Sequence, residues 1–135
     1  MTHRFLEHIA DVKFRAEGST IEEMYSSAAD ALNETIRGDI KILEQEEESF
    51  EVEGPDSEVL LYNFLEEFLF LLDAKEFLVA GIKSIEVEGD KIKCTVLGDK
   101  AENYVFTNDV KAVTYSGMII GEGHGKFFCE VVLDV

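Results

Sequence analysis

The sequence contains few cysteines, and their positions exclude two common uses of this residue. Cys94 and Cys129 are the only two, and each lies inside an apolar, strand-like run. Two cysteines cannot form the disulfide framework of a small secreted domain, and neither has a close cysteine or histidine partner for a zinc site. We therefore expect two buried free thiols.

Long apolar runs are also missing. No apolar stretch reaches the roughly 20 residues that a membrane-spanning helix needs, and the opening MTHRFLEH has no hydrophobic segment of a signal peptide. We expect a cytoplasmic protein with no membrane segment.

Basic residues are scarce: 12 Lys and Arg stand against 29 Asp and Glu, which gives a net charge of −17. Nucleic-acid affinity depends largely on Lys and Arg displacing counterions, so we expect no direct nucleic-acid binding. Such a surface attracts a basic protein or a cation. An acidic cytosolic protein with no such partner would have the same composition, and the charge alone does not separate the two interpretations.

What the sequence does contain is enough apolar material for a core. Hydrophobic residues make up 46% of its 135 residues, and this length is typical of one domain. We therefore expect a single domain over residues 1–135, which folds on its own.

Two segments have the apolar periodicity of helices, at about 20–37 and 56–74. The first has a capping-box pair in Thr20 and Glu23 and a terminating Gly38. The second follows Pro55 and Asp56, which suit a first turn. Their apolar faces are Ile21, Met24, Tyr25, Ala28, Leu32 and Ile36 in the first helix, and Leu61, Phe64, Leu65, Phe68 and Leu72, widened by Leu60, Phe70 and Leu71, in the second.

The remaining segments alternate like strands. ADVKFRAEG places Val12, Phe14 and Ala16 on one face, and SFEVEG alternates apolar residues with glutamates. Turns are predicted at Gly89-Asp90 and in GEGHGK. The acidic run LEQEEESFEVEG reads as a solvated loop plus an edge strand. This order of elements predicts an α+β fold with mostly antiparallel sheet packed with two main helices.

Candidate chemistry lies at the two ends of the chain. FLEHIADVKFRAEG contains His8 and Asp11, and the terminal VVLDV contains Asp134 beside the α-carboxylate of Val135. Two side-chain carboxylates and a terminal carboxylate would suit a hard cation such as Ca²⁺ or Mg²⁺. The alternative is structural, with Asp134 an exposed acid and Asp11 the cap of a turn. A hydrolase built from His8, Asp11 and Ser116 is a further alternative, although no G-x-S-x-G motif surrounds the serine.

Four segments, spread in order over nearly the whole chain, resemble the archease family. They are EHIADVKFRAEGSTIEEMYSSAADAL, LLYNFLEEFLFLLD, VKAVTYSGM and the terminal VVLDV. The family pattern His-Thr-Ala-Asp corresponds to His8-Ile9-Ala10-Asp11, and Lys-Ala-Val-Thr-Tyr-His corresponds to Lys111–Ser116. The sequence thus departs from the family at Ile9, which replaces a threonine, and at Ser116, which replaces a histidine.

The resemblance implies an archease-like fold and an accessory protein in place of an enzyme. Its partner would be the GTP-dependent RtcB-type RNA ligase of tRNA splicing and RNA repair, whose guanylylation and multiple turnover archeases promote. The family's divalent metal site maps onto Asp11, Asp134 and Val135, with Ca²⁺ as the expected ion and Mg²⁺ or Mn²⁺ as alternatives. Lys111 is a further candidate for activating the partner, and His8 is expected to shape the turn that presents Asp11.

Two other functions stay open at this point. A stand-alone metal-dependent hydrolase would turn over substrate without a partner and would depend on His8. A chaperone-like binding module would bind exposed apolar segments without needing Asp11 or the end of the chain.

Overall fold

The computed structural model describes residues 2–6, 11–107 and 110–135, which form seven strands, two α-helices and a short 3-10 helix. The elements are β1 (Thr2–Leu6), β2 (Val12–Gly18), α1 (Ile21–Arg37), β3 (Glu46–Glu53), α2 (Ser57–Lys75), β4 (Phe77–Glu88), β5 (Lys91–Lys100), η1 (Ala101–Asn103), β6 (Ala112–Gly123) and β7 (Lys126–Asp134). The predicted α+β class is confirmed.

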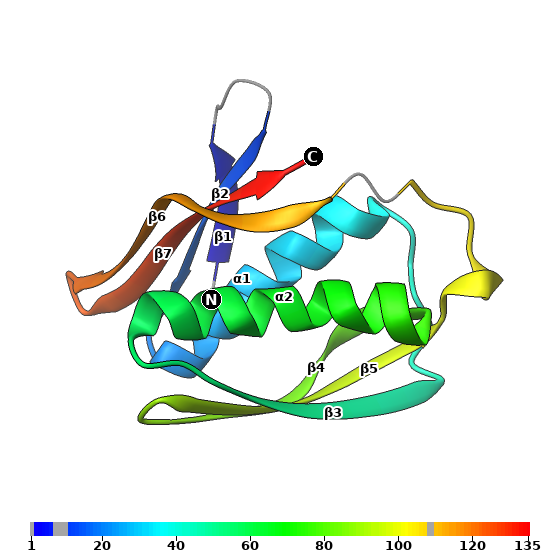
Figure 1. The fold of residues 1–135 in the computed structure, drawn as a ribbon, viewed down its shortest axis with the longest axis horizontal. Helices are drawn as coiled ribbons and strands as arrows, with labels where there is room; N and C mark the ends of the chain where they lie inside the picture. Colours follow the sequence, from blue (N-terminus) through cyan, green and yellow to red (C-terminus); the bar gives the residue numbers. More distant parts are fainter. Residues whose placement is uncertain (1, 7–10, 108–109) are drawn as a thin grey trace.

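The strands form two antiparallel sheets with the helices between them (Figure 1). The four-stranded sheet has the order β1-β2-β7-β6, and the three-stranded sheet has the order β3-β5-β4. α1 packs mainly on β2 and β4, whereas α2 packs mainly on β6 with further contacts to β3 and β4. Each helix therefore packs against both sheets, and the hydrophobic core fills the space between the helices and the sheets.

The capping box predicted for the first helix is confirmed, and the second helix has a cap that the sequence placed in its first turn. The Thr20 side chain accepts from the backbone N–H of Glu23, whose carboxylate accepts from the Thr20 N–H in return. α2 begins after Asp56, whose carboxylate accepts from the Val59 N–H. Asp56 is thus the cap that precedes the helix and does not belong to its first turn.

The predicted turns and edge strand are also found. β4 and β5 join through Gly89 and Asp90, with Gly89 at φ 61°. β6 and β7 join through His124 and Gly125, and both have positive φ, as a type I′ hairpin turn requires. β3 is an edge strand, but it begins at Glu46, so more of the acidic run is strand than the sequence indicated.

One core prediction is wrong. All the other apolar positions predicted for the second helix are buried, but Phe70 is 51% exposed. α2 lies between two sheets, so the side of the helix that carries Phe70 faces away from both. The sequence also gave no prediction for β1, which pairs with β2 along the outer edge of the four-stranded sheet.

The aromatic cluster around Phe64 is the centre of packing between α2 and its neighbours. Phe64 is fully buried and makes edge-to-face contacts with Tyr25 of α1 and Phe68. We expect Phe64→Ala to lower the free energy of unfolding by about 3–5 kcal/mol, because it removes a buried ring and leaves a cavity. Urea denaturation at neutral pH measures this change.

The matched control for that substitution is Phe70→Ala on the same helix. Since the Phe70 ring is half exposed, its loss should cost less than about 1 kcal/mol. Equal costs at the two positions would contradict the placement of α2.

Candidate functional site at one end of the four-stranded sheet

Asp11 and Asp134 are brought together by the pairing of β2 with β7. Val12 pairs with Leu133, so Asp11 directly precedes the paired region and Asp134 directly follows it. On the other side of β7, Ala112 pairs with Asp134, and the Lys111 N–H donates to the Asp134 carbonyl at 2.7 Å. Residues at both ends of the chain and in the late motif thus meet at one end of the sheet.

The alternation of side chains places Asp134 in the outward-facing series of β7. In β2, Phe14 and Ala16 are fully buried, whereas Lys13 and Arg15 face outward and form ion pairs with Glu130 of β7. Asp11 lies two residues before Lys13, and Asp134 lies four after Glu130. Because strand side chains alternate with a period of two, Asp134 follows the outward series of β7, whereas Asp11 lies in a bend just before β2.

The neighbouring outward charges neutralise each other. Arg15 Nη1 lies 2.9 Å from a Glu130 carboxylate oxygen, and Lys13 Nζ lies 3.5 Å from the other. Arg15 also donates to Glu17 at 3.0 Å, and its guanidinium lies 4.1 Å from the centroid of the Phe128 ring. Lys13 and Arg15 are therefore already engaged with these groups of their own sheet.

The candidate residues at this end of the sheet offer only oxygen donors. Asp11, Asp134 and Val135 are all partly buried, and the α-carboxylate of Val135 follows Asp134 directly. Within the described residues, no group of three or more His, Cys, Asp or Glu side chains could hold a metal. A cation here would therefore need the terminal carboxylate or other oxygens besides the two aspartates. In kind, these donors fit Ca²⁺ or Mg²⁺.

Two further predicted residues differ in what the structure says of them. Lys111 is exposed, and its backbone is held by the bond to Asp134. His8, predicted to shape the turn before Asp11, lies outside the described residues together with Ile9.

The late motif contains an irregularity that the sequence did not reveal. The β6–β7 register shifts between Thr114 and Ile119, and Gly117 in this interval has φ 73°. Ser116 is exposed, and its N–H donates to the Thr114 hydroxyl at 3.1 Å. The ring of Tyr115 stacks on that of Tyr62 from α2, with centroids 4.3 Å apart.

α2 also fixes the start of β6 through a hydrogen bond. The Glu66 carboxylate accepts from the Val113 N–H at 3.1 Å. Sequence reasoning did not single out Glu66 or Tyr62, because the only available signal was a polar position within an apolar helix.

A family model described as "Archease protein family (MTH1598/TM1083)" matches residues 3–135. The chain belongs to the archease family. Protein archease of Methanosarcina mazei is 35% identical over 141 residues, covering 98% of this chain and 95% of that protein. Protein archease of Pyrococcus abyssi is 37% identical over 136 residues, covering 96% and 95%.

Solved structures agree with the archease fold. The solution structure of Methanobacterium thermoautotrophicum protein 1598 has a TM-score of 0.81 at 29% identity and covers 98% of each chain. The crystal structure of a Thermotoga maritima archease, described as a possible chaperone, has a TM-score of 0.68 at 21% identity and covers 96% of this chain and 94% of that one. At this lower identity the second likeness concerns the fold alone.

The remaining nucleophile candidates of this archease chain are the two cysteines, and both are buried as predicted. Burial raises the pKa of Cys94 and of Cys129 to about 12. The thiolate is the reactive form of cysteine, so neither residue suits nucleophilic chemistry near neutral pH.

None of the helices among the described residues has the length and apolarity to span a bilayer.

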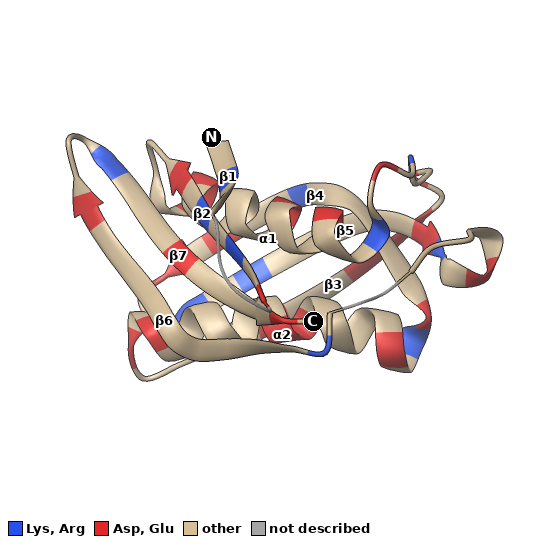
Figure 2. Cartoon of the chain, turned by 90° about the horizontal axis from the view of Figure 1, so that it is seen from above, with Lys and Arg blue, Asp and Glu red and all other residues tan. Residues whose placement is uncertain are grey.

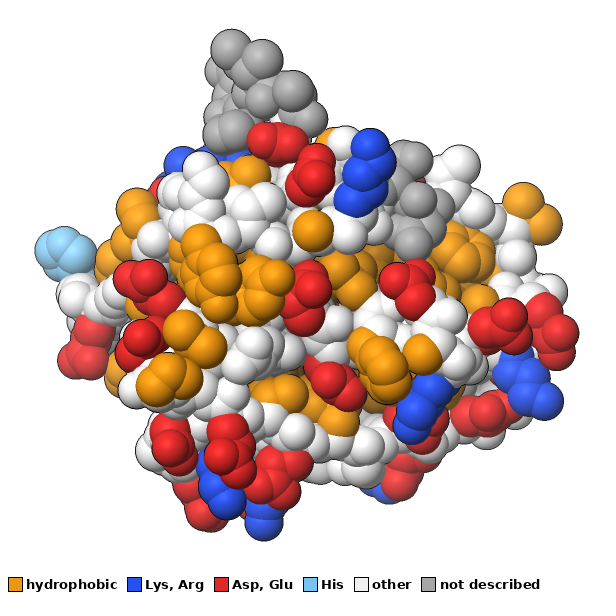
Figure 3. Space-filling view, in the orientation of Figure 1, with side chains coloured by type: hydrophobic (Ala, Val, Ile, Leu, Met, Phe, Trp, Pro, Cys, Tyr) orange, Lys and Arg blue, Asp and Glu red, His pale blue; other side chains and the backbone are white. Residues whose placement is uncertain are grey.

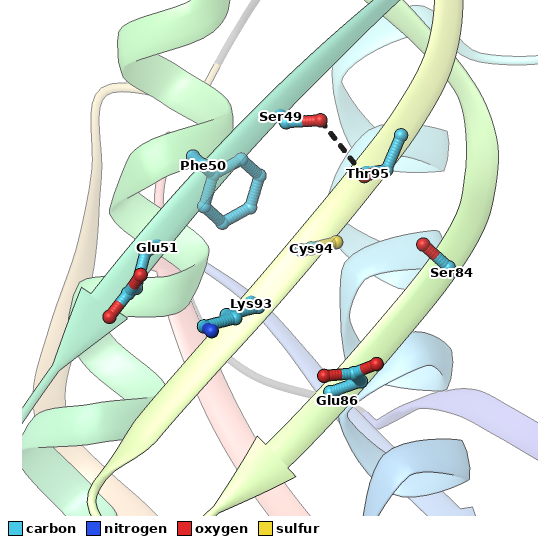
Figure 4. A pocket seen from close by; sticks show the side chains of 8 residues that line it. All are labelled: Ser49, Phe50, Glu51, Ser84, Glu86, Lys93, Cys94 and Thr95. Atoms are coloured by element: carbon cyan, nitrogen blue, oxygen red, sulfur yellow. Dashed lines mark hydrogen bonds between the residues drawn. The ribbon is translucent and has the colours of Figure 1, made fainter.

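A shallow pocket of about 540 Å³ lies on the three-stranded sheet, in the layer opposite the aspartates (Figure 4). One row across its strands carries Ser49, Thr95 and Ser84, and the first two are hydrogen-bonded at 2.9 Å. The next row on the same face is charged, with Lys93 between Glu51 and Glu86. Of the predicted site residues that the structure describes, Asp11, Lys111, Asp134 and Val135, none lines this pocket.

A buried carboxylate anchors the connection that leads from β5 toward β6. Asp99 is 5% exposed and accepts from the Tyr104 hydroxyl at 2.8 Å, from Asn103 and from the Lys100 N–H. The Tyr104 oxygen in turn accepts from the Leu43 N–H at 2.9 Å. The hydrogen bond from Tyr104 is the main cause that holds the pKa of Asp99 below its ordinary value.

We expect Tyr104→Phe to raise the pKa of Asp99 and to lower the stability of the fold. The pKa of Asp99 is lower in the folded protein than in the unfolded chain, where it is 3.8. The ionised carboxylate therefore stabilises the fold fully at pH values above the unfolded pKa, and this stabilisation is lost as the pH falls through the folded pKa. The stability difference between wild type and variant should therefore be constant near neutral pH and shrink in acid.

NMR titration of the Asp99 carboxyl and unfolding curves at several pH values measure the two effects. Tyr115→Phe, in which the affected ring is half exposed in β6, should leave the Asp99 titration unchanged. An unshifted Asp99 titration in Tyr104→Phe would contradict the role assigned to its hydroxyl.

Proposed function

We propose that this chain is an accessory protein of a GTP-dependent RtcB-type RNA ligase in tRNA splicing and RNA repair. It promotes guanylylation of the ligase and allows multiple turnover, and it catalyses no reaction itself. Family membership supports the proposal, and the single observation that carries it to residues is the meeting of Asp11 with Asp134 across the β2–β7 ladder.

A divalent cation, with Ca²⁺ preferred over Mg²⁺ or Mn²⁺, belongs to the proposal. Asp11, Asp134 and the α-carboxylate of Val135 would hold it, because they offer the oxygen donors that hard cations take. When bound, the ion supplies positive charge that attracts the phosphate oxygens of a nucleotide.

Two backbone contacts position the residues that would hold this cation. The pairing of Val12 with Leu133 sets the spacing of the two aspartates, and the bond from the Lys111 N–H to the Asp134 carbonyl holds the last strand against the start of β6. The exposed Lys111 side chain is then available to the partner's nucleotide site, and His8 would shape the turn before Asp11.

The charge of the chain suits a role beside RNA without contact to it. Acidic residues are spread over both sheets and both helices (Figure 2), and the net charge is −17. Such a surface repels phosphate backbones and favours encounter with the basic, RNA-binding side of a cytoplasmic ligase.

We expect Asp11→Asn and Asp134→Asn to abolish stimulation of ligase guanylylation while the protein stays folded. Both changes keep the side-chain size and remove one ligand charge, so the loss should be at least about tenfold in the GTP-charging rate. Charging of purified cognate ligase with labelled GTP, with and without each variant, measures the effect.

The control for these variants is Asp39→Asn, because Asp39 is an exposed acid after α1 and distant in the chain from either aspartate. It should stimulate as the wild type does. Normal stimulation by Asp134→Asn would overturn the assigned role of the sheet end.

Cation binding can be tested without the ligase. Titration calorimetry with Ca²⁺ should give at least about tenfold weaker binding for Asp134→Asn and for removal of Val135 than for the wild type. Mg²⁺ and Mn²⁺ titrations on the same samples rank the ions. Equal affinities in wild type and both variants would contradict the proposed ligand set.

The second candidate function, a chaperone-like binding module, is favoured by the exposed rings of Phe70 and Tyr115. It predicts protection of an aggregating client protein that persists in Asp134→Asn. Client protection without any stimulation of the cognate ligase would favour this candidate over the first.

A further inference from the structure

One side of α2 faces neither sheet and carries aromatic side chains. Phe70 is 51% exposed and Tyr115 of β6 is 49% exposed, and the Tyr115 ring stacks on Tyr62 at an interplanar angle of 14°. Glu66 and Glu67 lie between Tyr62 and Phe70 on the helix. We call the surface formed by Tyr62, Glu66, Glu67, Phe70 and Tyr115 the α2 lateral face. Figure 3 shows hydrophobic patches with acidic side chains between them on this side of the molecule.

The position of Tyr115 results from the irregularity in β6. The register shift between Thr114 and Ile119 takes Tyr115 out of the β6–β7 ladder, and Gly117 allows the turn with its positive φ. Bulges of this kind redirect side chains. Here the redirected ring of Tyr115 covers Tyr62, so β6 adds an aromatic side chain to the exposed surface of α2.

An acidic hollow adjoins the aromatic rings. It measures about 390 Å³ and is lined by Val52, Glu53, Asn63, Glu66, Glu67 and Phe70, so the ionisable residues among its described lining are all glutamates. Glu53 pairs with Lys91 at 3.4 Å, and Glu66 accepts from the Val113 N–H. Among the described residues, no lysine or arginine forms an ion pair with Glu67. Burial raises the pKa of Glu67, although Lys75 opposes this.

This combination fits a basic side chain of another protein. An arginine guanidinium stacks on aromatic rings and pairs with carboxylates, and aromatic and arginine residues are enriched at protein interfaces. A nucleic acid would bring its phosphates against the glutamates. A second copy of the chain, with its own charge of −17, would bring acid against acid.

We infer that the α2 lateral face is the surface on which the ligase docks, through an arginine-bearing basic patch of that partner; this rests on the proposed function. Docking and activation then use different surfaces. The lateral face determines how tightly the two proteins bind, and the end of the sheet with Asp11 and Asp134 determines what the bound protein does.

The test measures affinity and stimulation separately. Fluorescently labelled chain is titrated with purified cognate ligase to obtain Kd, and the GTP-charging rate is then measured at saturating chain. Phe70→Ala and Glu67→Lys should each raise Kd at least about tenfold, the size of effect expected of a central interface residue. At saturation both should restore the wild-type charging rate.

Two other variants serve as controls. Leu43→Ala removes an equally exposed apolar side chain, 50% exposed, outside the lateral face, and should keep the wild-type Kd. Asp134→Asn should keep the Kd and lose stimulation. Circular dichroism and urea unfolding of each variant verify that it is folded.

The outcomes separate the two proposals. If the wild type binds and stimulates while Phe70→Ala and Glu67→Lys bind as tightly, the docking assignment is overturned and the proposed function stands. If the wild type neither binds nor stimulates its cognate ligase, the proposed function is overturned and the docking assignment with it. Sedimentation showing a wild-type dimer that Phe70→Ala dissociates would assign the face to a second copy and also overturn the inference.

Discussion

The antiparallel pairing of β2 with β7 joins segments from near the two ends of the chain in the middle of one sheet. Seven residue pairs from Val12–Leu133 to Gly18–Phe127 form this ladder, and β1 and β6 flank it on either side. The fully buried Phe14, Ala16, Val131 and Leu133 present its inner face to the helices. This ladder is the link between the β1–β2 pair and the β6–β7 pair, so the four-stranded sheet depends on it. Contacts of such long sequence separation also form at a high entropic cost.

Local patterns were enough to predict the helices and turns. Apolar periodicity and the capping pair of Thr20 and Glu23 defined α1, and Gly89 located the β4–β5 turn, because these features act within a few residues of each other. The same reasoning led to a wrong prediction for Phe70. Periodicity identifies an apolar residue on a helix but cannot tell that a helix between two sheets has a free side, and an aromatic residue on that side looks like core.

The candidate site was predictable only in part for a related reason. Spacing in the sequence offers no link between Asp11 and Asp134, since strand pairing across the whole chain brings them together. The resemblance to the archeases supplied that link, and the register of β2 with β7 gives it a physical basis. The shift in β6 that exposes Tyr115 has no local signal beyond Gly117, and the contact of Glu66 with Val113 has none.

The hydrogen bond from the Val113 N–H to Glu66 has a mechanical consequence. Val113 adjoins Ala112, which pairs with Asp134, so this bond ties α2 to the start of β6 beside the sheet end. The stacked rings of Tyr62 and Tyr115 join the same two elements a second time. Two joints between one helix and one strand resist hinging, so the α2 lateral face keeps its orientation relative to the end of the sheet.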